Sequence, residues 1–218
     1  KTVRRQRQMC IRDRDEIVEL LRATRDQAES AVDRRALDLM EVVAERRAIE
    51  LQNQAGPHVK PALAALKRAF DHEWAEGEHA MMMGFLTNLG TMPQNELAAE
   101  QRRQMKQLYD WAQAGTFDRL QMASHYANML WNYKKQEEAL LELEATIAEF
   151  DEANDRKWSQ QGNGILNNYL GKLQRKGRYA DIEKILLDHL TRPRNKTQIT
   201  HFENCLLYTS DAADERSC

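Results

Sequence analysis

Two neighbouring stretches decide the fold: MASHYANMLWNY at residues 122–133 and QEEALLELEATIAEF at residues 136–150. Neither contains Gly or Pro, and residues with good helix propensity dominate the second stretch. Its apolar side chains recur every three or four positions, at Ala139, Leu140, Leu143 and Ile147. Because this is the spacing of one helix face, the two stretches predict a pair of helices that pack on each other.

The pattern returns along the chain. Residues 165–176 and 179–190 are expected to form a second helix pair, after a polar, Gly-containing connection at 154–164. Ala98, Ala139 and Ile182 align at separations of 41 and then 43 residues. A repeat of this length is typical of stacked helical units, each too small to bury its own apolar face.

The N-terminal half is also predicted to be helical. Residues 15–54 contain no Gly or Pro, so we expect one long helix or two helices broken near 30–33. After Gly56, Pro57 and Pro61, further helices are expected over 62–89 and 94–113. Within 15–54, the positions expected to face inward are Ile17, Leu21, Thr24, Ala28, Val32, Ala36, Leu39 and Val43, and those expected on the charged outer face include Arg34, Arg35, Glu45, Arg46 and Arg47.

Two similar motifs lie in the C-terminal pairs. Tyr126-Ala127-x-x-Leu130 is followed by Glu138-Ala139-Leu140, and YLGxL at 169–173 is followed by KGRYA at 176–180. Over Leu120–Leu190 these motifs resemble tetratricopeptide repeats, although the period is longer than the family's 34 residues and Ile182 stands where a small residue is expected. The resemblance implies a superhelical stack of helical hairpins with a concave groove for a peptide or a segment of another protein.

The two ends of the chain are predicted not to be native protein. Codons for RRQRQMCIRD at 4–13 exist whose reverse complement encodes CLLYTSDAAD at 205–214. This DNA resembles a transposase-end adapter of sequencing libraries, so residues 1–14 and 205–218 are set aside. All three cysteines fall in these ends, and no disulfide or cysteine site is expected. The remaining segments are a charged helix or helix pair at 15–55, a helical hairpin at 56–115 and two repeat-like hairpins at 116–204.

Composition limits the partners. Without the ends, 25 basic and 30 acidic side chains remain of the 32 and 34 in the whole chain, a net charge of −5. This balance lacks the basic field of a nucleic-acid-binding protein. No apolar run approaches the ~20 residues of a membrane span, so no membrane partner is expected. A cytoplasmic location is the default, and secretion stays open because the native N-terminus is expected to be missing.

His72, Glu76 and His79 are the strongest candidates for a chemical site. If 62–89 is one helix, their i, i+4 and i+7 spacing places them on one face, within reach of a metal ion. Glu76-x-x-His79 is also the residue pair of di-iron helical bundles, but no second Glu-x-x-His lies between 15 and 204. A solvated or ion-paired helix face is the favoured interpretation, so no metal site, cofactor or catalytic residue is predicted.

Other distinctive residues have ordinary interpretations. Met81–Met83 are expected to include one core residue and one partly exposed residue, because consecutive helical positions point in different directions. The four tryptophans are expected in the core or at hairpin interfaces, and Arg175–Arg178 in a solvated turn. Asn195-Lys196-Thr197 matches a glycosylation acceptor.

The sequence therefore predicts an all-α helical-repeat scaffold that binds a protein or peptide partner and has no catalytic activity of its own. Two alternatives stay open. One is a helical regulatory or structural segment of a larger signalling or enzymatic protein. The other is a metal-binding helical protein that uses His72, Glu76 and His79.

We expect deletion of residues 1–14 and 205–218 to leave the thermal unfolding midpoint unchanged, because adapter-encoded residues were not selected to pack. Differential scanning calorimetry of the whole and shortened chains checks this. A drop of more than a few degrees, on the order of 1 kcal/mol for a domain of this size, contradicts it.

Overall fold

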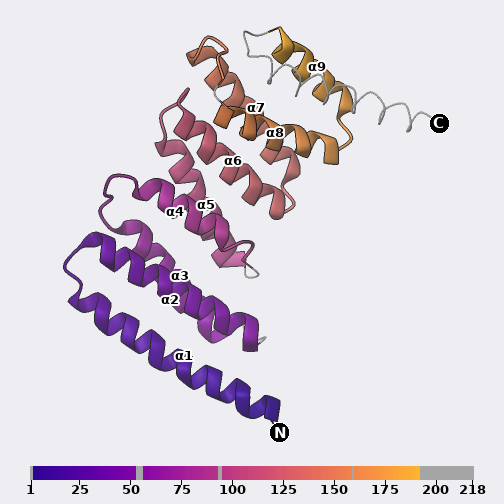
Figure 1. Cartoon of the computed structure of the whole chain (residues 1–218). Coiled ribbons are helices and arrows are strands. Elements are labelled where there is room, and N and C mark those ends of the chain that lie inside the picture. Colours follow the sequence, from indigo (N-terminus) through magenta and orange to yellow (C-terminus); the bar gives the residue numbers. More distant parts are fainter. Residues whose placement is uncertain (1, 53–55, 93–94, 159, 192–218) are drawn as a thin grey trace. The chain divides into compact units, whose positions relative to one another are not determined.

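The computed structural model describes residues 2–52, 56–92, 95–158 and 160–191. These residues form nine helices and no strand, which confirms the predicted all-α class (Figure 1). None of the described helices is long and apolar enough to cross a membrane. Contacts divide the chain into two compact units between Leu108 and Tyr109. The helices are α1 (Thr2–Gln27), α2 (Ala31–Gln52), α3 (Gly56–Asp71), α4 (Glu78–Asn88), α5 (Asn95–Trp111), α6 (Phe117–Asn132), α7 (Gln136–Ala153), α8 (Gln160–Arg175) and α9 (Tyr179–Leu190).

In the first unit, α1 packs on α2, and α2 packs on α3 (Figure 1). Two buried glutamines tie α5 to its neighbours. The Nε2 of Gln104 donates to the Leu66 carbonyl of α3 (2.9 Å), and the Nε2 of Gln101 donates to the Leu86 carbonyl of α4 (2.7 Å). The apolar core around these contacts includes Leu66, Met82, Met83, Leu86, Leu97, Met105 and Leu108.

The break between α1 and α2 falls at residues 28–30, so the two-helix alternative for 15–54 is confirmed. Ser30 caps α2, because its hydroxyl accepts a hydrogen bond from the backbone N–H of Asp33 (3.0 Å). The first residues of two helices differ from those expected from the sequence. α1 begins at Thr2 and so includes residues expected to be non-native, and α3 begins at Gly56 and contains Pro61.

The single helix expected over 62–89 is wrong, because α3 and α4 are separate helices. The cause is Arg35 of α2, whose side chain is fully buried. Its guanidinium donates to the carbonyls of Ala69 (2.8 Å), His72 (2.7 Å) and Glu73 (3.0 Å). The last carbonyls of a helix need partners of this kind, so the guanidinium stabilises the end of α3.

The inward face expected for α1 and α2 is largely wrong. Ile17, Val32 and Val43 are 51%, 40% and 48% exposed, whereas Arg35 and Glu45, expected on the outer face, are buried. The buried charged side chains of α2 have partners on α1, α3 and α4. Part of the expected inward face, at Ile17, Val32 and Val43, is left facing outward, while Leu39 is buried.

In the second unit, α6 and α7 form a hairpin, α8 packs against both of them, and α9 packs against α8. The helices expected at 122–133, 136–150, 165–176 and 179–190 are confirmed as α6 to α9, and the last agrees at both ends. Buried side chains from all four helices form the core of this unit. They include Leu120, Ala127, Leu130, Ala139, Leu140, Leu143, Leu166, Leu173 and Leu186.

The alignment of Ala98, Ala139 and Ile182 agrees with the structure. Each is the fourth residue of its helix, in α5, α7 and α9 respectively. All three are buried, with 4%, 0% and 5% of their surface exposed. The sequence period therefore marks equivalent positions on every second helix.

Gly115 of the second unit leaves no room for a side chain. Its φ is +76°, and an added Cβ would overlap the Cβ of Ala153. We expect Gly115→Ala to lower the free energy of unfolding by about 1–3 kcal/mol, because strain and overlap add. Gly164→Ala is the matched control in α8, where nothing lies within 4 Å of an added Cβ. It should raise stability by about 0.5–1 kcal/mol. Urea denaturation measures both, and an unchanged Gly115→Ala variant contradicts the expectation.

Candidate functional site

The Arg35 side chain forms the centre of a closed structural cluster in the first unit. One guanidinium nitrogen donates to the Glu78 carboxylate, and the guanidinium carbon lies 4.1 Å from the centroid of the Trp74 ring. Glu78 also accepts a hydrogen bond from the backbone N–H of Ala75 (2.7 Å). Burial raises the pKa of Glu78, but the hydrogen bonds from Arg35 and the Ala75 backbone, together with the charge of Arg35, outweigh it, and the pKa lies below its ordinary value. Arg35 is therefore engaged by its own unit.

Three buried carboxylates of α2 continue this cluster along the helix. Each contacts an arginine or histidine on a neighbouring helix, and the arginines compensate the charges of Asp38 and Glu41 within the unit. The arrangement holds α2 in register between α1 and α3 and leaves no charge for a ligand. The contacts are Arg68 Nε to Asp38 Oδ1 (2.9 Å), Arg22 Nη2 to Glu41 Oε1 (2.6 Å), Arg68 Nη2 to Glu41 Oε2 (2.7 Å) and His58 Nδ1 to Glu45 Oε2 (2.9 Å).

The proposed metal-ligand residues do not share a helix face. His72 and Glu76 lie between α3 and α4, and only His79 lies in a helix. The Nε2 of His72 is 2.8 Å from an oxygen of Asp38, Glu76 is exposed, and His79 stacks on Trp74 with ring centroids 4.3 Å apart. Burial, and then the charge of Arg35, lower the pKa of His79. Across the described ranges, no three His, Cys, Asp or Glu side chains are placed to hold a metal ion.

A different group of polar side chains gathers in the second unit, between α6 and α8. The ammonium of Lys172 on α8 donates to the side-chain oxygens of Asn168 (2.7 Å) and Asn128. Asn168 donates in turn to the hydroxyl of Ser124 (2.9 Å), and the Lys172 nitrogen lies 5.4 Å from the centroid of the Trp131 ring. We call these five residues the α6–α8 polar strip. Four of them are half-buried, so the strip reaches the surface.

The charge at the centre of the strip is uncompensated. Lys172 is only 4% exposed, yet no carboxylate among the described residues lies within ion-pair distance of its nitrogen. One turn further on, by contrast, Lys176 pairs with Glu137 (2.7 Å). Burial, and to a lesser extent the charge of Arg175, lower the pKa of Lys172 to about 8. An anion beside this ammonium would gain an interaction that the protein itself does not supply.

Sequence reasoning missed the strip. Asn168 and Lys172 are spaced i, i+4 on α8, which is a signal for one polar helix face. Nothing in that spacing identifies Asn128, which lies forty positions earlier on another helix. Single polar pairs of this kind are common on helices, so the strip becomes a candidate only when its members are seen together.

The remaining predictions have mixed outcomes. Met81 is 49% exposed while Met82 and Met83 are buried, as expected. Trp111 is 58% exposed, so it is not a core residue. Trp158 packs edge-on against Phe150 and His189, with centroid distances of 5.2 and 5.4 Å. The turn at 175–178 joins α8 to α9 as expected, and the acceptor pattern at 195–197 lies outside the described residues.

Comparison with known proteins adds no family to this picture. No protein-family model, no curated protein and no solved structure matches the chain. A function for this protein is therefore argued from the geometry of its own residues.

We expect one lysine to titrate near pH 8 in the folded protein, well below the ordinary 10.5. Between these two values the unfolded chain holds a proton that the folded chain has lost, so the contribution of Lys172 to stability rises with pH. NMR titration of lysine ¹³Cε resonances should show this signal, and Lys172→Met should remove it. Lys184→Met, which replaces an exposed lysine of α9, should leave it in place.

The coupling between the pKa of Lys172 and stability can be measured separately. We expect the difference between the free energies of unfolding of the native protein and of Lys172→Met to grow in favour of the native protein from pH 8 to pH 10. A difference that stays constant over this range contradicts the lowered pKa.

Proposed function

We propose that the chain is a helical-repeat scaffold of the tetratricopeptide kind, and that its second unit binds a segment of another protein along α6 and α8. Lys172 receives an acidic group of that segment. The observation that carries the proposal is the buried ammonium of Lys172, held by two amide oxygens and without a described carboxylate partner.

The packing of the second unit supports the repeat part of the proposal. In tetratricopeptide-like stacks, the first helix of each hairpin contacts both helices of the hairpin before it. The contacts of α8 with α6 and α7 fit this order, and so does the pairing of α9 with α8. The equivalent buried positions on α7 and α9 agree with two units of one repeat.

The chemistry of the strip supports the binding part. An extended segment of another protein carries backbone N–H and C=O groups that need partners. Asn128 and Asn168 each have a side-chain donor and acceptor, and Ser124 adds a hydroxyl. These neutral groups suit a polypeptide backbone, while Lys172 adds preference for a carboxylate. The proposal includes no catalytic step.

A selection of random peptides tests the proposal and does not require an identified partner. A displayed library of random linear peptides is selected on the immobilised full chain and, in parallel, on the Lys172→Gln chain. We expect peptides from the native protein to be enriched in Asp, Glu or a free C-terminal carboxylate relative to the starting library. The enrichment should disappear on Lys172→Gln, because the glutamine side chain carries no charge.

Two controls separate a site from general attraction between charges. Lys184→Gln removes an exposed lysine of the same unit and should keep the enrichment. Asn128→Ala and Asn168→Ala should each lower the affinity for the selected peptides by about 5- to 30-fold, which is the effect of losing a hydrogen bond to a charged or backbone group. Equal enrichment on the native and Lys172→Gln chains contradicts the proposal.

A further inference from the structure

The outward side of the α1–α2 hairpin is apolar. Ile17 and Leu20 on α1 are 51% and 66% exposed, and Val32, Met40 and Val43 on α2 are 40%, 57% and 48% exposed. Isolated exposed apolar residues are common, but these are three positions apart on α1, and eight and then three positions apart on α2. Ile17, Val32 and Val43 belong to the inward face expected from the sequence, but they do not lie in the interior of the first unit. We call the five exposed residues the α1–α2 face.

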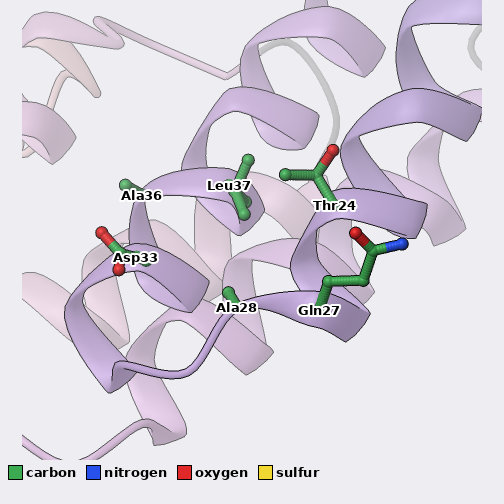
Figure 2. Close-up of a pocket in the computed structure, with 6 residues that line it drawn as sticks. All are labelled: Thr24, Gln27, Ala28, Asp33, Ala36 and Leu37. Atoms are coloured by element: carbon green, nitrogen blue, oxygen red, sulfur yellow. The ribbon is translucent and has the colours of Figure 1, made fainter.

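A groove lies between the two helices. Figure 2 shows the six residues that line it, near the connection between α1 and α2, around a hollow of about 400 Å³. A groove between two helices accepts the side-chain ridges of another helix. The lining residues are Thr24 and Gln27 from α1, Ala28 from the connection after it, and Asp33, Ala36 and Leu37 from α2.

We propose that a second copy of this chain covers the α1–α2 face, with the two hairpins antiparallel about a two-fold axis that passes near Met40. Charge complementarity selects this occupant. Exposed Asp33 and Arg47 lie seven residues before and after Met40, on the same side of α2. In the antiparallel arrangement, Asp33 of each copy meets Arg47 of the other, and the central methionines meet each other. A parallel arrangement would bring like charges together at both ends.

The size of the face agrees with a dimer. The stripe from Val32 to Arg47 is about 24 Å long at 1.5 Å per residue, and two helices side by side are about 20 Å wide. The resulting face is on the scale of a small specific interface, roughly 600–800 Å² of accessible surface per partner. A two-fold interface needs one self-complementary patch, and two hairpins that pack in this way form a four-helix bundle. The charges of the face are free to exchange partners, since the Arg47–Glu50 pair (3.2 Å) is largely exposed.

Sedimentation equilibrium of the full chain tests the proposal, from about 1 to about 100 µM because association depends on concentration. The chain has a mass of 25.4 kDa, and we expect it to approach twice this mass as concentration rises. Met40→Glu should return the mass to that of one chain, because it places two carboxylates at the axis. Leu141→Glu is the matched control, since Leu141 is 66% exposed on α7 in the second unit, and this variant should still dimerise.

A charge exchange distinguishes a second copy from any other occupant. Arg47→Asp alone and Asp33→Arg alone should each weaken dimerisation by at least tenfold. The double variant, with both changes, should recover most of the native affinity, which only a partner carrying the same two positions can produce. Circular dichroism confirms that each variant keeps its helices.

Several results overturn the proposal. They are a native chain that sediments as a single copy throughout, a Met40→Glu chain that still dimerises, a Leu141→Glu chain that does not, and a double variant weaker than both single variants. A partner of another kind on this face would give the first of these results. None of these outcomes depends on the α6–α8 polar strip.

Discussion

The buried guanidinium of Arg35 is the interaction on which the first unit depends. It lies on α2, and its hydrogen bonds reach the end of α3, the connection after it and the start of α4. An arginine has five N–H donors in a fixed plane, so it can hold several chain segments in one geometry. Removing one partner from a buried pair of this kind typically costs about 3–5 kcal/mol, because the other charge is left without compensation. Arg35 therefore sets where α3 ends and how α4 begins.

The burial of charged residues on α2 also determines which side chains of the first unit are exposed to solvent. A helix has a limited circumference, and the inward side of α2 is occupied by Arg35, Asp38, Glu41 and Glu45. Buried ion pairs contribute little net stability compared with apolar side chains of the same size, but they specify register well. Val32, Met40 and Val43 therefore lie on the outer side, while Leu39, Val42 and Ile49 share the buried side with the charges. The paired charges on the buried side of α2 fix the register of the first unit and also leave an apolar face on its outer side.

Periodicity predicted the second unit better than the first, and the reason is physical. In α6 to α9 most inward positions are apolar, so spacing of three and four residues marks both the helices and their buried faces. The motif residues Tyr126 and Tyr169 are buried. In α1 to α4 the inward positions include charges that are paired over distances of 13 to 43 residues along the chain. No local pattern reveals such pairs, so the helices of α1 and α2 were predicted while their buried face and the end of α3 were not.

The candidate site also follows from long-range pairing. Arg35 and Lys172 are both buried cations in helical units, and sequence spacing treats them alike. Arg35 has a carboxylate from its own unit, and its other donors bind carbonyl oxygens. Lys172 has only neutral oxygens. A buried charge is costly unless an opposite charge or several hydrogen bonds stabilise it, and amide oxygens stabilise an ammonium less than a carboxylate does. The charge of Arg35 is compensated within the fold, whereas the charge of Lys172 would be stabilised most by an anion from another molecule. For this reason the α6–α8 polar strip, and not the larger charged cluster of the first unit, is the better candidate for binding.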